Sequence, residues 1–149
     1  MNYRETLDKE MVAAAKGKDK DRLSALRLIK NAFHNREIDL QRELNDEEIL
    51  QTLASMSKQR NDSIEQFRNG GRQDLVDKET KELHVIQEFM PVQLSEAEID
   101  REIAQAIAEL SATSIKDMGK VMKFLMVKLM GKVDGKLLGD KIKAKLSVQ

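Results

Sequence analysis

Three Gly-Lys pairs lie close together near the C-terminal end of the sequence: Gly119-Lys120, Gly131-Lys132 and Gly135-Lys136. Lysine beside glycine suits phosphate, because a backbone without a side chain lets an anion approach the ammonium group and the main-chain N–H groups. The pattern has three explanations: a nucleotide site, a contact with a nucleic-acid backbone, or glycines that only mark where helices end and begin.

A nucleotide site is the weakest of these explanations. The P-loop needs four residues between its first glycine and Gly-Lys, then Ser or Thr, and it follows a strand. Gly131 and Gly135 have three residues between them, Leu137 follows Lys136, and the preceding segment has helical spacing. Because all three requirements fail, the sequence does not predict nucleotide binding here.

Residues for metal binding or acid–base catalysis are also sparse. The chain has no cysteine and two histidines, His34 and His84. The residues three positions before them are Asn31 and Lys81, not Glu, so the Glu-x-x-His motif of di-metal helical bundles is absent. Acidic pairs such as Glu47-Glu48 are expected by chance among 26 acidic residues. The sequence predicts no metal, no cofactor and no catalytic group, so a role as an enzyme is left open and disfavoured.

The composition favours helices. Hydrophobic residues make up 40% of the 149 residues and aromatic residues 3%, and there is one proline. Leu, Met, Ala, Glu, Lys and Gln, which form helices well, dominate. The N-terminus has no signal-peptide pattern, and no apolar run approaches the ~18 residues of a membrane span. We therefore expect an all-α protein of the cytoplasm without a membrane partner.

Apolar spacing predicts seven helices. Capping boxes open the third, fifth and sixth helices, and Pro91 prevents the fourth from continuing. We expect two small helical lobes, a four-helix lobe over residues 1–92 and a three-helix lobe over residues 93–149. The expected helices are marked by Leu7–Ala15, Leu23–Phe33, Asn45–Phe67, Leu75–Ile86, Ser95–Leu110, Ser114–Leu129 and Asp134–Leu146.

The zero net charge hides an uneven distribution. Residues 116–145 hold nine lysines and three aspartates, whereas residues 93–115 hold one arginine and five acidic residues. A local positive field of this kind is typical of proteins with a polyanionic partner, although a solvated lysine face is a common alternative. The positive segment contains all three Gly-Lys pairs.

The sixth helix is expected to bury one face and to expose lysines on the other. Lys116, Lys120 and Lys123 project opposite the apolar stripe, with Val127, Met130 and Phe124 among or beside them. Either a partner or a neighbouring helix covers these apolar groups. The buried face is expected to contain Met118, Val121, Met122, Leu125 and Leu129.

The glycines are expected to have separate roles. Gly119 lies inside the sixth helix, where glycine costs ~1 kcal/mol relative to alanine, so we expect close packing or the close approach of a partner. Gly131 is expected to end that helix, and Gly135 to lie at the start of the next. Gly139 continues a four-residue spacing typical of membrane helices, but the charged residues around it exclude a membrane. Close packing or backbone offered to a partner explains Gly139.

The segment "KDMGKVMKFLMVKLMGKVDGKLLGDKIKAKL" (116–146) resembles the YqeY domain. That helical module occurs alone in small bacterial proteins and at the C-terminus of the B subunit of the tRNA-dependent Asp/Glu-tRNA amidotransferase. Three further segments resemble the N-terminal half of the stand-alone proteins: "KQRNDSIEQF" (58–67), "GRQDLVDKE" (71–79) and "EFMPVQLSEAEI" (88–99). The resemblance covers most of the chain.

The resemblance implies a four-helix lobe followed by a three-helix lobe. In the amidotransferase the module helps to hold tRNA while catalysis occurs elsewhere, and the stand-alone proteins are associated with glutamine-dependent carbon–nitrogen ligases. Two hypotheses follow: an RNA-binding module for tRNA or another structured RNA, and an accessory protein that docks on an amidotransferase or a tRNA-related enzyme. Sequence-specific DNA recognition is not expected. The candidate RNA-binding residues are Lys116, Gly119, Lys120, Lys123, Gly131, Lys132, Gly135 and Lys136.

Overall fold

The computed structural model of the chain describes residues 2–147. These residues form seven α-helices and one short 3-10 helix and contain no strand, which confirms the all-α prediction. Contacts between residues divide the chain into two compact units, the first ending at Pro91 and the second beginning at Val92. Four α-helices belong to the first unit and three to the second.

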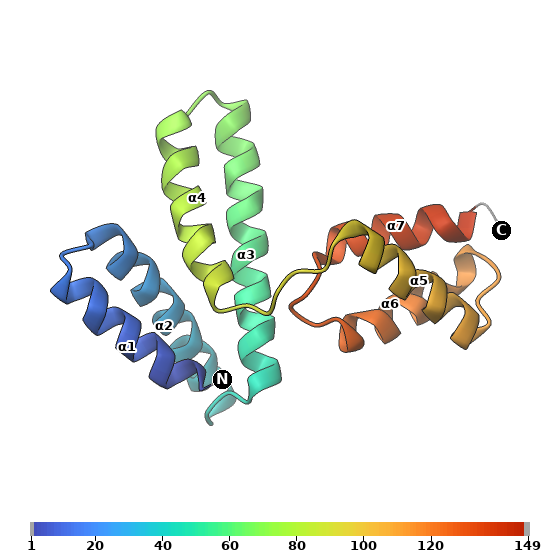
Figure 1. Cartoon of the computed structure of the whole chain (residues 1–149), viewed down its shortest axis with the longest axis horizontal. Coiled ribbons are helices and arrows are strands. Elements are labelled where there is room, and N and C mark those ends of the chain that lie inside the picture. The colour runs from blue at the N-terminus through green and yellow to red at the C-terminus, as the bar shows by residue number, and fades with distance from the viewer. Residues whose placement is uncertain (1, 148–149) are drawn as a thin grey trace. The chain divides into compact units, whose positions relative to one another are not determined.

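Two helical hairpins build the first unit, and Figure 1 shows them in blue and green. α1 pairs with α2 and α3 with α4, and α4 also packs against α2. Asn2, Asp19 and Asn45 each accept a backbone N–H at a helix start, so the local sequence fixes where these helices begin. The four helices are α1 (Tyr3–Lys16), α2 (Lys20–Leu40), α3 (Asp46–Asn69) and α4 (Gln73–Glu88).

The core of the first unit lies where the two hairpins meet. Leu26, Ile29 and Leu53 are completely buried there, together with residues of all four helices. A second, smaller cluster formed by Ile64, Val76 and Leu83 belongs to the α3–α4 hairpin alone. The hairpin therefore carries part of its own apolar core, separate from the contact with α1 and α2.

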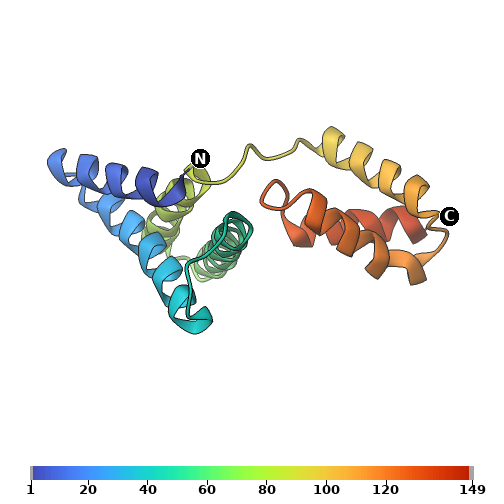
Figure 2. The same ribbon diagram turned by 90° about the horizontal axis from the view of Figure 1, so that it is seen from below.

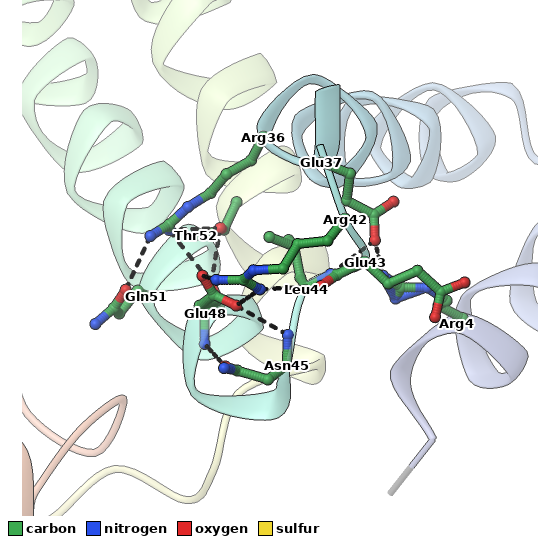
Figure 3. A network of polar contacts seen from close by, with 10 residues as sticks. All are labelled: Arg4, Arg36, Glu37, Arg42, Glu43, Leu44, Asn45, Glu48, Gln51 and Thr52. Atoms are coloured by element: carbon green, nitrogen blue, oxygen red, sulfur yellow. Dashed lines mark hydrogen bonds and ion pairs between the residues drawn. The ribbon is translucent and has the colours of Figure 1, made fainter. Parts of the chain in front are cut away.

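A polar network holds the loop between α2 and α3 (Figure 3). Arg42 donates to both carboxylate oxygens of Glu48, at 2.6 and 2.8 Å, and the same carboxylate accepts the backbone N–H of Asn45 at 3.1 Å. Asn45 in turn accepts the N–H of Glu48, so the predicted capping box is confirmed. The Arg42 guanidinium, and then the Asn45 N–H, lower the pKa of Glu48 to about 2.

The same loop has a second attachment to α2. Glu37 accepts the backbone N–H of Leu44 at 2.9 Å and forms an ion pair with Arg4 of α1. Arg36 donates to the hydroxyl of Thr52 at 3.0 Å, which ties the end of α2 to the first turns of α3. Glu37 thereby satisfies a backbone N–H that a loop outside regular helix leaves free.

An arginine with two carboxylates joins α3 to α4. Arg60 Nε lies 2.8 Å from Glu82 Oε2 and 3.2 Å from Glu79 Oε2. The three side chains are 17%, 13% and 19% exposed, so solvent screens them only in part. Without the arginine, two half-buried carboxylates of like charge would face each other.

Three helices build the second unit, which Figure 2 shows in yellow to red. Its elements are α5 (Glu96–Leu110), η1 (Ile115–Asp117), α6 (Met118–Lys128) and α7 (Gly135–Ser147). Val121, Leu125, Leu138 and Ile142 are completely buried where these helices meet. The expected apolar face of the sixth helix is confirmed, with Met118 and Met122 half-buried at its margin.

The start of α6 differs from the prediction. The segment that follows Ser114 is a 3-10 turn, η1, and α6 begins at Met118. The Asp117 carboxylate accepts the backbone N–H of Thr113 at 2.9 Å and of Ser114 at 3.3 Å. These two bonds lower the pKa of Asp117. The predicted Ser95–Glu98 capping box at α5 is present as expected.

Candidate nucleic-acid interface

The lysines of residues 116–145 fall into two groups. Three of them have partners on α5: Lys128 lies 3.0 Å from Glu102, Lys141 lies 3.0 Å from Asp100, and Lys120 donates to the carbonyl of Leu110 at 3.2 Å. The Asp100 carboxylate raises the pKa of Lys141. These lysines attach α6 and α7 to α5, and Lys120 is one of the predicted RNA-binding residues.

The side chains of the second group are exposed and make no ion pair or hydrogen bond within residues 2–147. Four of its members were predicted to bind RNA: Lys116, Lys123, Lys132 and Lys136. We call these four residues the lysine edge. Lys116 lies in η1, Lys123 on the outer face of α6, Lys132 in the following turn and Lys136 in the first turn of α7. Their charges are free to meet an anion.

Lys143 and Lys145 of α7 share this exposed, unpaired state among the described residues and were missed by the sequence analysis. The signal was available, since Lys143 lies seven residues after Lys136 and therefore projects from the same side of α7.

α5 differs from α6 and α7 in the charge of its side chains. Its outer face is acidic, with Arg101 as its one basic residue.

The glycines do not all expose backbone as the phosphate hypothesis requires. Gly131 is buried, with φ +76°, and its carbonyl accepts the side-chain amide of Gln93 at 2.6 Å. Gly135 is half-buried, and a Cβ there would lie 3.7 Å from the Met126 methyl. Gly131 and Gly135 therefore belong to the packing of the turn. Gly131 comes three residues after α6 ends at Lys128, not directly at the helix end.

Gly119 is the exposed glycine of the three. A Cβ built on it meets no atom within 4 Å among the described residues. The expectation of close packing is therefore wrong for Gly119, because no neighbour occupies that space. The other explanation, close approach of a partner, stays a prediction.

Gly139, unlike Gly119, is closely packed. A Cβ atom added to it would lie 3.8 Å from the Met122 methyl, so Gly139 faces α6 across the contact between α6 and α7.

The start of α7, near the lysine edge, already has an internal partner. Asp134 accepts the N–H of Leu137 there at 3.1 Å. Its carboxylate occupies the position where a phosphate would meet the helix N-terminus. The Asp117 carboxylate instead accepts the N–H groups of Thr113 and Ser114, which precede η1, and makes no cap bond at the start of α6. Contacts with an anion at the start of α7 must therefore come from the lysine side chains.

Apolar groups are exposed beside these lysines. Val127 on the outer face of α6 is 67% exposed and Met126 is 38% exposed, whereas Phe124 and Met130 are half-buried. Phe124 packs against the core of the second unit. The neighbouring helices therefore cover part of the expected apolar group and leave Val127 open.

The described residues hold no group of three or more His, Asp or Glu side chains that could bind a metal ion. His34 and His84 are both exposed. His34 lines a pocket of about 130 Å³ in the first unit, smaller than the roughly 300–1,000 Å³ of most ligand sites. The cations of that pocket are already paired, Arg4 with Glu37 and Lys30 with Asp8. Within residues 2–147, no helix is long and apolar enough to cross a bilayer.

Three yeast proteins named "Altered inheritance of mitochondria protein 41, mitochondrial" are similar in sequence. The protein of Lachancea thermotolerans is 37% identical over 117 residues, which are 76% of this chain and 60% of that protein. The Kluyveromyces lactis protein is 31% identical over 93% of this chain and 72% of its own length. A Saccharomyces cerevisiae protein is 33% identical over 89% of this chain and 68% of its own length.

This chain therefore spans about three fifths of the Lachancea protein and about seven tenths of the other two. The names of these relatives place them in mitochondria, so the expectation of a cytoplasmic location finds no support in them, and their organisms are yeasts rather than bacteria. The sequence also matches the family described as "Yqey-like protein" over residues 4–146, which include nearly all of both units. The chain belongs to the YqeY-like protein family.

Proposed function

We propose that this protein is a non-catalytic RNA-binding module whose ligand is tRNA or another structured RNA. The observation that carries the proposal is the lysine edge: four exposed lysines without internal partners in the described residues, on consecutive elements of the second unit. Free ammonium groups release counterions when they meet phosphates, which is the main source of nucleic-acid affinity. The resemblance to the tRNA-holding module of the amidotransferase B subunit supports the choice of RNA.

The charge distribution of the second unit supports the same proposal. Acidic side chains outnumber basic ones on α5, where Lys128 and Lys141 pair with three of them, and the lysine edge lies on η1, α6, the turn after α6, and α7. A polyanion is attracted by the lysine edge and not by α5, so the field favours one orientation of approach. RNA binding is compatible with a location in the cytoplasm or in mitochondria, because both compartments contain structured RNA.

The proposal is tested with a variant of the full chain that carries Lys116→Gln, Lys123→Gln, Lys132→Gln and Lys136→Gln. If each lysine meets about one phosphate, the slope of log K against log salt concentration falls in magnitude by about 3 to 4. The measurement is fluorescence anisotropy of labelled tRNA between 50 and 200 mM salt. Circular dichroism should show unchanged helix content, because all four side chains are exposed.

A matched control removes four exposed lysines from the first unit: Lys9, Lys16, Lys18 and Lys58, each replaced by Gln. These side chains also have no partner among the described residues, so the net charge changes equally. The control variant should keep most of the tRNA affinity and most of the salt slope. Equal loss in both variants, or full binding by the lysine-edge variant, contradicts the proposal.

The absence of catalysis is part of the proposal and needs its own test. Rigorously purified protein should neither release ammonia from glutamine nor bind ATP. The proposal of a non-catalytic role fails if glutaminase turnover persists through purification and one point substitution abolishes it.

A second candidate function, docking on an amidotransferase or another tRNA-related enzyme, rests on a different observation. Val127 and Met126 are 67% and 38% exposed beside the lysine edge, and apolar groups in such a position suit a protein contact. Salt separates the two functions, because apolar docking lacks the steep salt dependence of phosphate binding. Val127→Ser should weaken docking on an enzyme and leave the salt slope of RNA binding unchanged.

A further inference from the structure

The polar side chains of the segment that carries the lysine edge are unusually uniform. Residues 116–146 contain nine lysines and three aspartates, and no Ser, Thr, Asn, Gln, His, Arg, Tyr or Trp. Readout of a base edge ordinarily uses the amides of Asn and Gln or the rigid fork of Arg. Lysine can also donate to guanine, but its ammonium group is a point charge on a flexible stem and fixes direction less than the Arg fork does. The segment therefore offers phosphates many charges and offers bases few oriented groups.

Two of the three aspartates are also engaged. Asp117 accepts the N–H groups of Thr113 and Ser114, and Asp134 accepts that of Leu137. One oxygen of each carboxylate is thereby bound to the backbone of the second unit. What remains for a nucleic acid is a set of flexible ammonium groups, which bind phosphate oxygens with little demand on direction.

Unpaired bases have no stacking partner on this surface. Proteins that hold single strands stack bases on aromatic rings or on Arg guanidinium planes. Phe124 is the one aromatic residue after residue 92, and it is half-buried against the core of the second unit. Arg101 is the one arginine there, and it lies among the acidic residues of α5. Affinity for a single strand would have to come from phosphates alone.

Building on the proposed function, we propose that the lysine edge binds the paired stem of an RNA through its phosphates and does not read base sequence. A duplex carries the phosphates of two strands, so its charge density is higher than that of a single strand. A stem of about 16 base pairs has roughly thirty phosphates, so phosphates are in excess over the four lysines whatever the base sequence.

The experiment compares three labelled RNAs with the full chain by fluorescence anisotropy at one salt concentration. They are a hairpin with a stem of about 16 base pairs, a second hairpin with the same base composition in permuted order, and an unstructured strand with the same number of nucleotides. We expect the two hairpins to bind within about threefold of each other. The unstructured strand should bind at least tenfold more weakly.

Each outcome bears on a separate statement. Equal or tighter binding of the unstructured strand, or a more than tenfold preference between the two stems, overturns this inference and leaves the proposed RNA binding standing. No measurable binding of any of the three RNAs overturns both. The lysine-edge variant described above should lose affinity for both stems to the same extent, and retention of one stem would reveal a sequence-reading contact elsewhere.

Discussion

Replacement of Gly119 by alanine should stabilise the second unit. Gly119 is the second residue of α6, and a methyl group there meets no atom within 4 Å among the described residues. Its φ lies outside the left-handed region that favours glycine. The substitution therefore adds no clash and no backbone strain, while it removes part of the conformational entropy of the unfolded chain.

The expected gain follows from helix propensity. Glycine in a helix is about 0.5–1 kcal/mol less favourable than alanine, and the first turn lies at the low end of that range. The second unit spans residues 92–149, so it falls near the smallest domains for which 1 kcal/mol shifts the Tm by about 4–8 °C. We expect a rise of about 2–5 °C in the unfolding of this unit.

The assay is thermal unfolding of the full chain together with hydrogen exchange of α6 and α7 amides, because the first reports the Tm and the second the local free energy of opening. Gly139→Ala is the comparison: its methyl would lie 3.8 Å from the Met122 methyl, an ordinary contact, so we expect a similar gain in stability. Faster exchange in α6 of the Gly119→Ala protein would refute the reasoning. RNA affinity measured on the same protein tests whether a partner approaches Gly119 closely. If a phosphate strand contacts this backbone, the added methyl group should weaken RNA binding.

Three other substitutions have defined outcomes. Gly131→Ala should destabilise the second unit by about 1–2 kcal/mol, measured by hydrogen exchange of α7, because φ is +76° there. Arg60→Ala should lower the free energy of unfolding of the first unit by about 2 kcal/mol in denaturant titrations, because it leaves two half-buried carboxylates unpaired. The control Arg68→Ala, at an exposed residue, should lower it by less than about 0.5 kcal/mol. Glu48 has a pKa lowered to about 2, so the stability that its carboxylate contributes is present above about pH 4.5 and is lost as the pH falls toward 2. In acid titrations, the difference in unfolding free energy between the native protein and Glu48→Gln should therefore shrink from about pH 4.5 to about pH 2. A difference that is independent of pH would contradict the last prediction.

The helices could be predicted from sequence because their signals are local. Asn45 and Glu48, like Ser95 and Glu98, form a capping box from four consecutive residues, and Pro91 excludes helix by its own covalent structure. Such signals require no knowledge of distant neighbours. The 3-10 turn before α6 was missed because a capping box looks the same in sequence whichever kind of helix follows it.

The candidate interface was less predictable because its properties depend on other elements. Lys120 has the sequence context of a free lysine, yet the Leu110 carbonyl at the C-terminal end of α5 accepts a hydrogen bond from its ammonium group. Gly131 looks exposed in a Gly-Lys pair, but residues that precede α5 cover it: the Leu94 N–H donates to Lys132, and Gln93 donates to Gly131 itself. These contacts join segments almost forty residues apart, and no spacing rule reports them.

The contact between α6 and α7 makes the second unit sensitive to oxidation. Met118, Met122 and Met126 follow one another at intervals of four residues. A Cβ atom added to Gly139 would lie 3.8 Å from the Met122 methyl, and one added to Gly135 would lie 3.7 Å from the Met126 methyl. Peroxide converts a thioether into a polar sulfoxide, with water as the other product. Met126 is 38% exposed, so it is open to that reaction, and glycine opposite it has no side chain to pair with the new oxygen. The helix that carries Lys136 is therefore held in place by a contact that an oxidising environment weakens and that methionine sulfoxide reductases restore.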